Sequence, residues 1–185
     1  MTGATLGLLS VVAALVQTSD PSPRVVSFCE LLEHRVEYNG LIVKVRGEVK
    51  AGGHGPSLTA PSTCDYRLVT RAVTWPNVIF LTYPNNQSPV PEDHAGFRVD
   101  WKSIRSAEQS VRLSNFDLNT DHLFETYVGR FVTHPDLGSR VNPPSLGGTR
   151  LGFGPIGLDA PAQLVIESVS EVSIVHGKPG ARVIP

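Results

Sequence analysis

Segment 41–50 alternates apolar and charged residues and is the clearest structural signal in this sequence. The apolar set is Leu41, Val43, Val45 and Val49, and the charged set is Lys44, Arg46, Glu48 and Lys50. A period of two places the sets on opposite faces of a β-strand, so that one face is buried and the other faces water. Gly47 falls on the apolar face, where a missing side chain lets a strand bend sharply. The segment therefore predicts a long, bent strand of the kind that small barrels need.

Shorter runs rich in β-branched and aromatic residues predict the remaining strands. They are expected at 66–70, 78–82, 123–133 and 164–175, with a flexible loop at 51–56 and a turn or sheet edge at Pro76. The alternation slips near Ser168 to Ser170, which indicates a bulge or bend in the last strand.

One helix is expected before these strands, and a second is expected between the third and the fourth strand. Ser27 and Glu30 have the spacing of a capping box, and apolar residues follow at helical spacing, namely Phe28, Leu31, Leu32 and Val36. Asp100 is expected to cap a second helix, whose apolar face carries Trp101, Ile104, Ala107 and Val111. The predicted fold class is therefore mainly β: a small five-stranded OB-fold-like barrel with a short N-terminal helix and one helix between strands three and four.

The N-terminus predicts export. An apolar run of about eleven residues, too short to span a bilayer comfortably, is followed by polar residues 17–20. We expect a signal peptide over residues 1–20, one domain over 21–185, a secreted or periplasmic location and no membrane span after the leader is removed. A buried N-terminal helix or strand and an uncleaved membrane anchor are the alternatives.

Both cysteines lie beyond this leader. In an oxidising compartment Cys29 and Cys64 are expected to form a disulfide, whereas the alternative is a pair of buried free thiols. A disulfide leaves neither of them as a catalytic nucleophile.

Five segments carry a resemblance to a known group of proteins. They are 29–32, 38–40, 43–49, 75–81 and 161–169. Together they resemble exported bacterial OB-fold-like proteins of unknown function. The resemblance implies the fold and the export route, and it implies no activity and no catalytic residue.

Composition and motifs exclude several kinds of function. The formal net charge is −1, so no strong field attracts polyanions, and nucleic acid is not the expected partner. The six histidines do not have metal-ligand spacing, and no serine lies in a GxSxG elbow. Residues 152–157 match GxGxxG, but Pro155 interrupts the helix that a dinucleotide site needs. We therefore expect no enzyme activity, no catalytic residue, no metal and no cofactor.

The candidate ligand-binding residues are Arg46, Tyr66, Arg67, Arg71 and Trp75. OB-folds bind ligands on that side, where aromatic rings can stack and guanidinium groups can pair with anions. The alternative is that the two aromatic residues pack in the core or rim and the arginines are solvated. The leading hypothesis is a non-enzymatic module that binds a small molecule, a glycan or an envelope protein. An oligonucleotide-binding domain and a hydrolase built from His and Asp residues are the other hypotheses.

Overall fold

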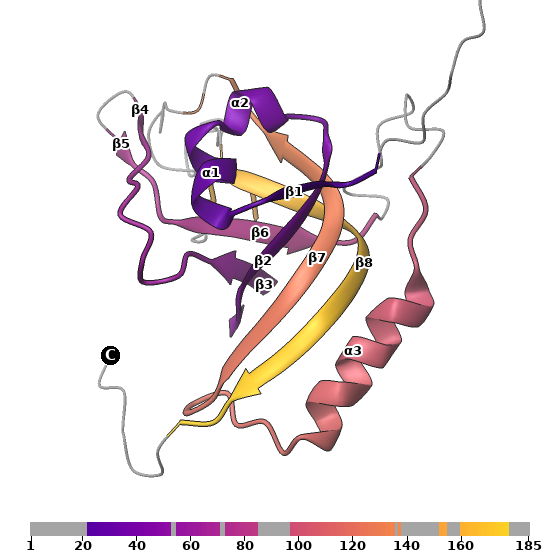
Figure 1. The fold of residues 1–185 in the computed structure, drawn as a ribbon. Coiled ribbons are helices and arrows are strands. Elements are labelled where there is room, and N and C mark those ends of the chain that lie inside the picture. The colour runs from indigo at the N-terminus through magenta and orange to yellow at the C-terminus, as the bar shows by residue number, and fades with distance from the viewer. Residues whose placement is uncertain are drawn as a thin grey trace, which may run out of the picture.

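The described part of the chain forms a closed five-stranded barrel with one extra strand, a separate two-stranded sheet and three helices. Figure 1 shows their arrangement. The computed structural model describes residues 22–52, 55–70, 73–84, 97–135, 137, 152–154 and 160–177. The barrel strands are β2 (Ile42–Gly52), β3 (Gly55–Thr59), β6 (Val78–Thr82), β8 (Ala162–Val175) and β7 (His122–Thr133). They pair in that order, and β7 pairs back with β2. Among these five strands only β6 and β8 are parallel to each other. This strand order is that of a small OB-fold-like barrel, and the predicted fold class is confirmed.

Strand β2 takes part in both halves of the barrel. Its residues 42–49 pair with β7, and its residues 48–52 pair with β3. Gly47 lies just before this change of partner, and a Cβ atom there would lie 3.2 Å from Cδ2 of Leu58. Gly47 therefore faces inward, as predicted, at the point where β2 changes its pairing partner. The short strand β1 (Arg24–Val26) pairs in parallel with β2 and was not predicted.

The prediction for the second barrel strand was wrong. That strand is β3, from a segment whose Gly55-Pro56-Ser57 has the composition of a turn. Of the predicted strand at 66–70, only β4 (Val69–Thr70) is extended, and it pairs with β5 (Val73–Thr74) in a separate two-stranded sheet. Strand β3 forms because its backbone pairs with β2 on one side and β6 on the other, which the local sequence does not reveal.

Helix α3 (Trp101–Leu113) is confirmed, together with its cap. The Asp100 carboxylate accepts hydrogen bonds from the backbone N–H groups of Lys102 and Ser103, at 3.0 and 3.1 Å. Ile104 and Ala107 are buried as predicted. Trp101 is 48% exposed, because it lies in the first turn beside the Tyr83 ring rather than on the buried face.

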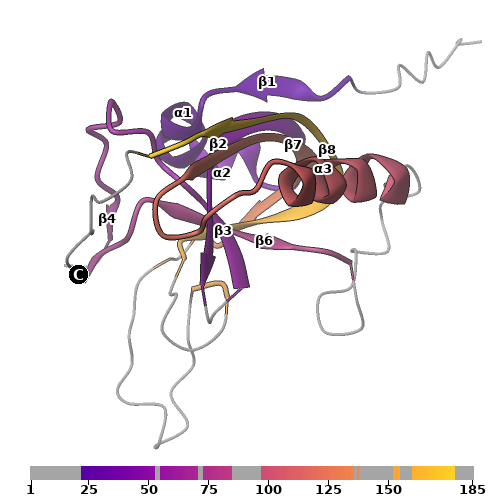
Figure 2. The same cartoon turned by 90° about the horizontal axis from the view of Figure 1, so that it is seen from below.

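The slip in the last strand corresponds to two irregularities in the pairing of β7 with β8, one on each side of residues 168–170. The first leaves Glu167 without a partner on β7, and its carbonyl accepts a hydrogen bond from the Asp100 N–H at 2.7 Å. The Ser103 hydroxyl accepts one from the Val169 N–H at 3.2 Å. The N-terminus of α3 is thus tied to the bulge, and Figure 2 shows α3 lying beside β7 and β8.

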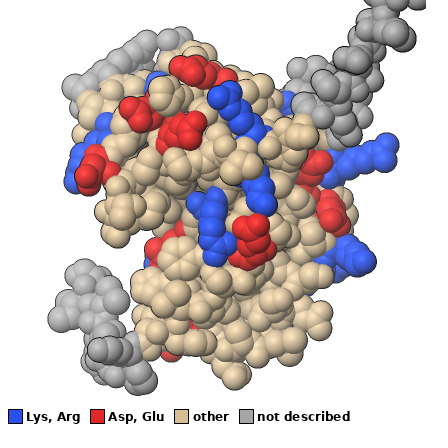
Figure 3. Space-filling view, in the orientation of Figure 1, with Lys and Arg blue, Asp and Glu red and all other residues tan. Residues whose placement is uncertain are grey.

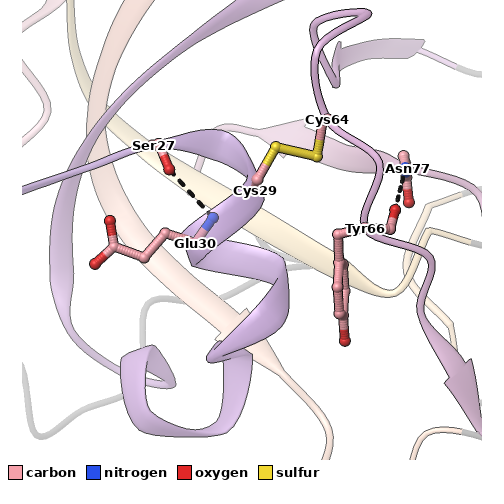
Figure 4. Close-up of a disulfide and its surroundings, with 6 residues drawn as sticks. All are labelled: Ser27, Cys29, Glu30, Cys64, Tyr66 and Asn77. Atoms are coloured by element: carbon pink, nitrogen blue, oxygen red, sulfur yellow. Dashed lines mark hydrogen bonds between the residues drawn. A yellow bond between two sulfur atoms is a disulfide. The ribbon is translucent and has the colours of Figure 1, made fainter.

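Helices α1 (Phe28–Glu33) and α2 (Arg35–Tyr38) lie at the other end of the barrel (Figure 1). The predicted cap is present, since the Ser27 hydroxyl accepts a hydrogen bond from the Glu30 N–H at 3.2 Å. Phe28, Leu31 and Leu32 are buried as predicted, but Val36 is half-exposed because α1 ends at Glu33. The predicted disulfide joins Cys29 of α1 to Cys64 in the loop between β3 and β6 (Figure 4).

The predicted leader at 1–20 lies outside the described residues. Within the described ranges, no helix is long and apolar enough to cross a membrane. The single domain over 21–185 stays a prediction.

Candidate functional site

Arg46, the first candidate ligand residue, braces a β-bulge. Its guanidinium donates hydrogen bonds to the Thr126 hydroxyl at 3.1 Å, to the Glu171 carbonyl at 2.6 Å and to the Ser173 hydroxyl at 2.6 Å. Glu171 lies in the second irregularity of β8 and has a positive φ of 52°, which is rare outside glycine. Arg46 therefore ties β2 across β7 to the strained part of β8.

The charges around Arg46 compensate one another. Lys44 donates a hydrogen bond to the Glu171 carboxylate at 3.0 Å, and the Thr126 hydroxyl donates another at 2.8 Å. Hydrogen bonds from Thr126 and Lys44 lower the pKa of Glu171. Figure 3 shows basic and acidic side chains interspersed over this side of the molecule. We call the outer face around Lys44, Arg46, Thr126, Glu171 and Ser173 the charged face.

Three of the other four candidates lie in the described part of the loop between β3 and β6. The Trp75 side chain packs against Leu68 and Leu137, is only 6% exposed, and donates a hydrogen bond to the Thr70 hydroxyl at 2.7 Å. Tyr66 packs against both this cluster and the main core, and its carbonyl accepts a hydrogen bond from Asn77 at 2.7 Å (Figure 4). Trp75 therefore has little ring surface left for stacking on a ligand.

Arg67 is exposed, and Arg71 lies outside the described residues. The hydrogen bonds of Arg46 lead to β7 and β8, not to the loop that carries Tyr66, Arg67 and Trp75. Within the described residues, the five candidates are thus not shown to converge on one surface, and their role in binding stays a prediction.

A second outer face is formed by β3 and β6, and neither strand contains a charged residue. Leu58, Ile79 and Leu81 belong to the core, so the alternate residues point to the other face. On that face Thr59, Val78 and Phe80 are partly exposed, whereas Ser57 and Thr82 are buried. The Phe80 ring lies close to Gly55, where a Cβ atom would be 3.2 Å from Cε2 of the ring. Gln163 of β8 is the register partner of Phe80. We call this surface the neutral face.

Two histidine–carboxylate pairs lie where β7 begins and β8 ends. Nδ1 of His176 is 2.8 Å from Oδ2 of Asp121, and Nδ1 of His122 is 2.6 Å from Oε1 of Glu48. The neighbours Asp121 and His122 thus have different partners, as expected for adjacent residues in an extended chain. Folding does bring one Asp and one His together.

Asp121 has a structural role in this arrangement. It accepts hydrogen bonds from the backbone N–H groups of Asp117 at 3.0 Å and Gly177 at 3.1 Å. The N–H of Asp117 is the main cause that lowers the pKa of Asp121 to about 2, and His176 and Gly177 add to it. Asp121 therefore joins the loop before β7 to the segment after β8. Among the described residues, no group of three potential ligands is placed to hold a metal ion.

Sequence reasoning missed a buried acid inside the barrel. Glu125 of β7 is only 6% exposed, and its carboxylate accepts a hydrogen bond from the Tyr127 hydroxyl. Burial is the main cause that raises the pKa of both Glu125 and Tyr127. The sequence did contain a signal for this position. Because side chains alternate between the two faces of a strand, Glu125 lies on the same face as Leu123 and Tyr127.

Comparison with protein-family models, curated proteins and solved structures finds no match to this chain, so the inference of function depends on the geometry described above.

Proposed function

We propose that this chain is an exported, non-enzymatic binding domain that takes an uncharged ligand, a glycan in the first instance, on its neutral face. The observation that carries the proposal is the absence of charge from β3 and β6, whose outer face has Thr59, Val78 and Phe80 as its partly exposed side chains. These are strands two and three of the barrel, the pair on which OB-folds bind oligonucleotides and oligosaccharides. An aromatic ring can pack on the apolar side of a sugar, and hydroxyl and amide groups can orient it.

The export part of the proposal is supported by the disulfide. Disulfides persist in oxidising compartments, and Cys29 and Cys64 are joined. The apolar run near the N-terminus adds a candidate leader. An intact mass of the exported protein, with and without reductant, tests both features: a leader-free mass that increases by two hydrogens on reduction is expected. Recovery of the full-length chain with two free thiols contradicts export.

The charged face argues for an uncharged ligand over an oligonucleotide. Binding to a phosphate backbone requires basic groups that can release counterions. Arg46 and Lys44 instead have acceptors within the protein, and β3 and β6 supply no basic residue. For the hydrolase hypothesis, the Asp121–His176 pair is present, but the remaining contacts of Asp121 are backbone N–H groups that it holds in place.

The test is an NMR titration of the isotopically labelled protein with cellohexaose and chitohexaose, and separately with single-stranded oligothymidine at low and high salt. We expect a glycan to shift the amide signals of β3 and β6. Phe80→Ala should weaken glycan binding about fivefold to tenfold, which is the contribution of an aromatic contact.

Arg46→Gln is the matched control, because it changes the charged face and should leave glycan affinity unaltered. Shifts that map to the charged face, or DNA binding that is strong at low salt and lost at high salt, contradict the proposal. Shifts from neither sugar would also contradict the glycan assignment.

A further inference from the structure

Glu125 lies inside the barrel, and none of the described basic residues forms an ion pair with it. It is the register partner of Gly47 on β2, and its neighbours Arg46 and Glu48 on that strand belong to the outward-facing set. The groups that act on Glu125 are the Tyr127 hydroxyl of its own strand and the Glu108 carboxylate of α3. Tyr83, which follows β6, also interacts with Glu108, Glu125 and Tyr127. Within the described residues, no lysine, arginine or histidine offsets the charge of Glu125.

Helix α3 packs against β8, the strand next to β7, and Figure 2 shows it beside both strands. Its buried residues Ile104 and Ala107 belong to the same core cluster as Tyr127, and Glu108 follows directly. The first turn of α3 is tied to the bulge of β8, and the Trp101 ring lies 5.7 Å from the Tyr83 ring. The helix that carries Glu108 thus packs on β8, next to the strand that carries the buried Glu125.

Ionising Glu125 in the packed barrel costs free energy, and movement of α3 can lower that cost. A buried carboxylate lacks hydration, and the negative charge of Glu108 adds repulsion. The hydrogen bond from Tyr127 stabilises the ionised form and only partly offsets burial, since the pKa of Glu125 remains raised. Water that enters when α3 moves away would hydrate the charge. The protonated carboxyl needs no such hydration.

We propose that Glu125 is a proton-operated switch for α3: the protonated side chain keeps the helix packed on the barrel, and the ionised side chain loosens it. This inference is independent of the ligand face proposed above.

The test uses Trp101 as a reporter on the helix itself. The chain has two tryptophans, so Trp75→Phe leaves Trp101 as the only one. Its quenching by acrylamide, followed between pH 4 and pH 8, should rise along one sigmoid as α3 loosens. The sigmoid should disappear in Glu125→Gln. Hydrogen exchange of the α3 amides in the chain with both tryptophans, corrected for the intrinsic pH dependence, should show the same loss of protection.

Two further variants keep the test decisive if Glu125→Gln does not fold. Tyr127→Phe removes the donor to the carboxylate and should raise the midpoint of the sigmoid. Glu108→Gln removes the repelling charge and should lower the midpoint by about half a pH unit. The proposal is overturned if the transition persists in Glu125→Gln, if these two variants shift the midpoint in the same direction, or if α3 protection does not depend on pH.

Discussion

The two ends of the barrel are held together by different kinds of interaction. At the end with α1 and α2, the Cys29–Cys64 disulfide and the apolar cluster around Trp75 join distant segments. At the end with α3, carboxylates do so, with Asp121 binding two backbone N–H groups and His176. A covalent bond and apolar contacts do not titrate in acid, whereas carboxylates do. We therefore call these the disulfide end and the carboxylate end.

One small domain thus has two separate chemical sensitivities. Reductant should act on the disulfide end, because the bond links α1 to the loop between β3 and β6. Acid should act on the carboxylate end, because Asp121 connects the segment before β7 to the segment after β8.

Removing the disulfide should cause the largest loss of stability. The double variant Cys29→Ser, Cys64→Ser opens a loop with a sequence separation of 35 residues. In the chain-entropy model this lowers the free energy of unfolding by about 3 to 4 kcal/mol. Urea titration measures the loss, and hydrogen exchange should show it in α1 and residues 60–70 first. The native protein in reductant is the control, and equal loss of protection in α3 would contradict the separation of the two ends.

Asp121→Asn should destabilise the carboxylate end by less than the loss of the disulfide and by more than the loss of a helix cap. The amide presents a donor where the carboxylate receives hydrogen bonds from Asp117 and Gly177. The pKa of Asp121 is lowered from 3.8 to about 2, so its stabilisation is present above pH 4 and is lost as the pH falls toward 2.

Urea midpoints measured from pH 7 down to pH 2 check this expectation. The difference between the native protein and Asp121→Asn should shrink across the acid range. A difference that is constant from pH 7 to pH 2 would show that the charge of Asp121 does not contribute.

The helix caps offer a matched pair, one at each end. Asp100→Ala removes an acceptor for two N–H groups of α3 and should cost about 1 to 2 kcal/mol. Ser27→Ala removes one acceptor of α1 and should cost about 0.5 to 1 kcal/mol, because the disulfide and buried Leu31 still position that helix. Thermal unfolding of both variants gives the comparison. In the disulfide-free background the cost of Ser27→Ala should rise and that of Asp100→Ala should not.

The sequence predicts well the elements whose two faces differ or whose caps are local. Strand β6 and the Asp100 cap agree with the prediction, and β2 differs by one or two residues at its ends. Strand β3 escapes prediction because Gly55-Pro56-Ser57 lacks alternation and becomes a strand only through its two neighbours. β-structure of this kind depends on pairing partners that are remote in sequence.

The sequence predicts the residue types of the candidate site but not the groups that these residues contact. Arg46 is correctly placed on an outer face, but its acceptor on Glu171 is 125 residues away, and no local pattern reveals it. Trp75 is recognisable as an aromatic residue near a turn, and only the fold shows that Leu68 and Leu137 bury it. The inward position of Glu125 follows from the alternation of side chains along β7. Which described groups surround its carboxylate depends on the packing of β6, β7 and α3.

Arg46→Gln should have the smallest effect on the free energy of unfolding. It tests whether Arg46 stabilises the bulge of β8 at Glu171. The variant loses charged donors to the Glu171 carbonyl and the Ser173 hydroxyl, at a partly exposed position, so we expect a loss of about 0.5 to 1 kcal/mol. Arg67→Gln is the matched control, since Arg67 is exposed and has no ion pair within the described residues, and it should leave stability unaltered. Urea titrations of both variants at low and high salt measure the difference. Equal stabilities would mean that the bulge at Glu171 is held by Lys44 and Thr126 alone, which would leave the Arg46 guanidinium available to a ligand.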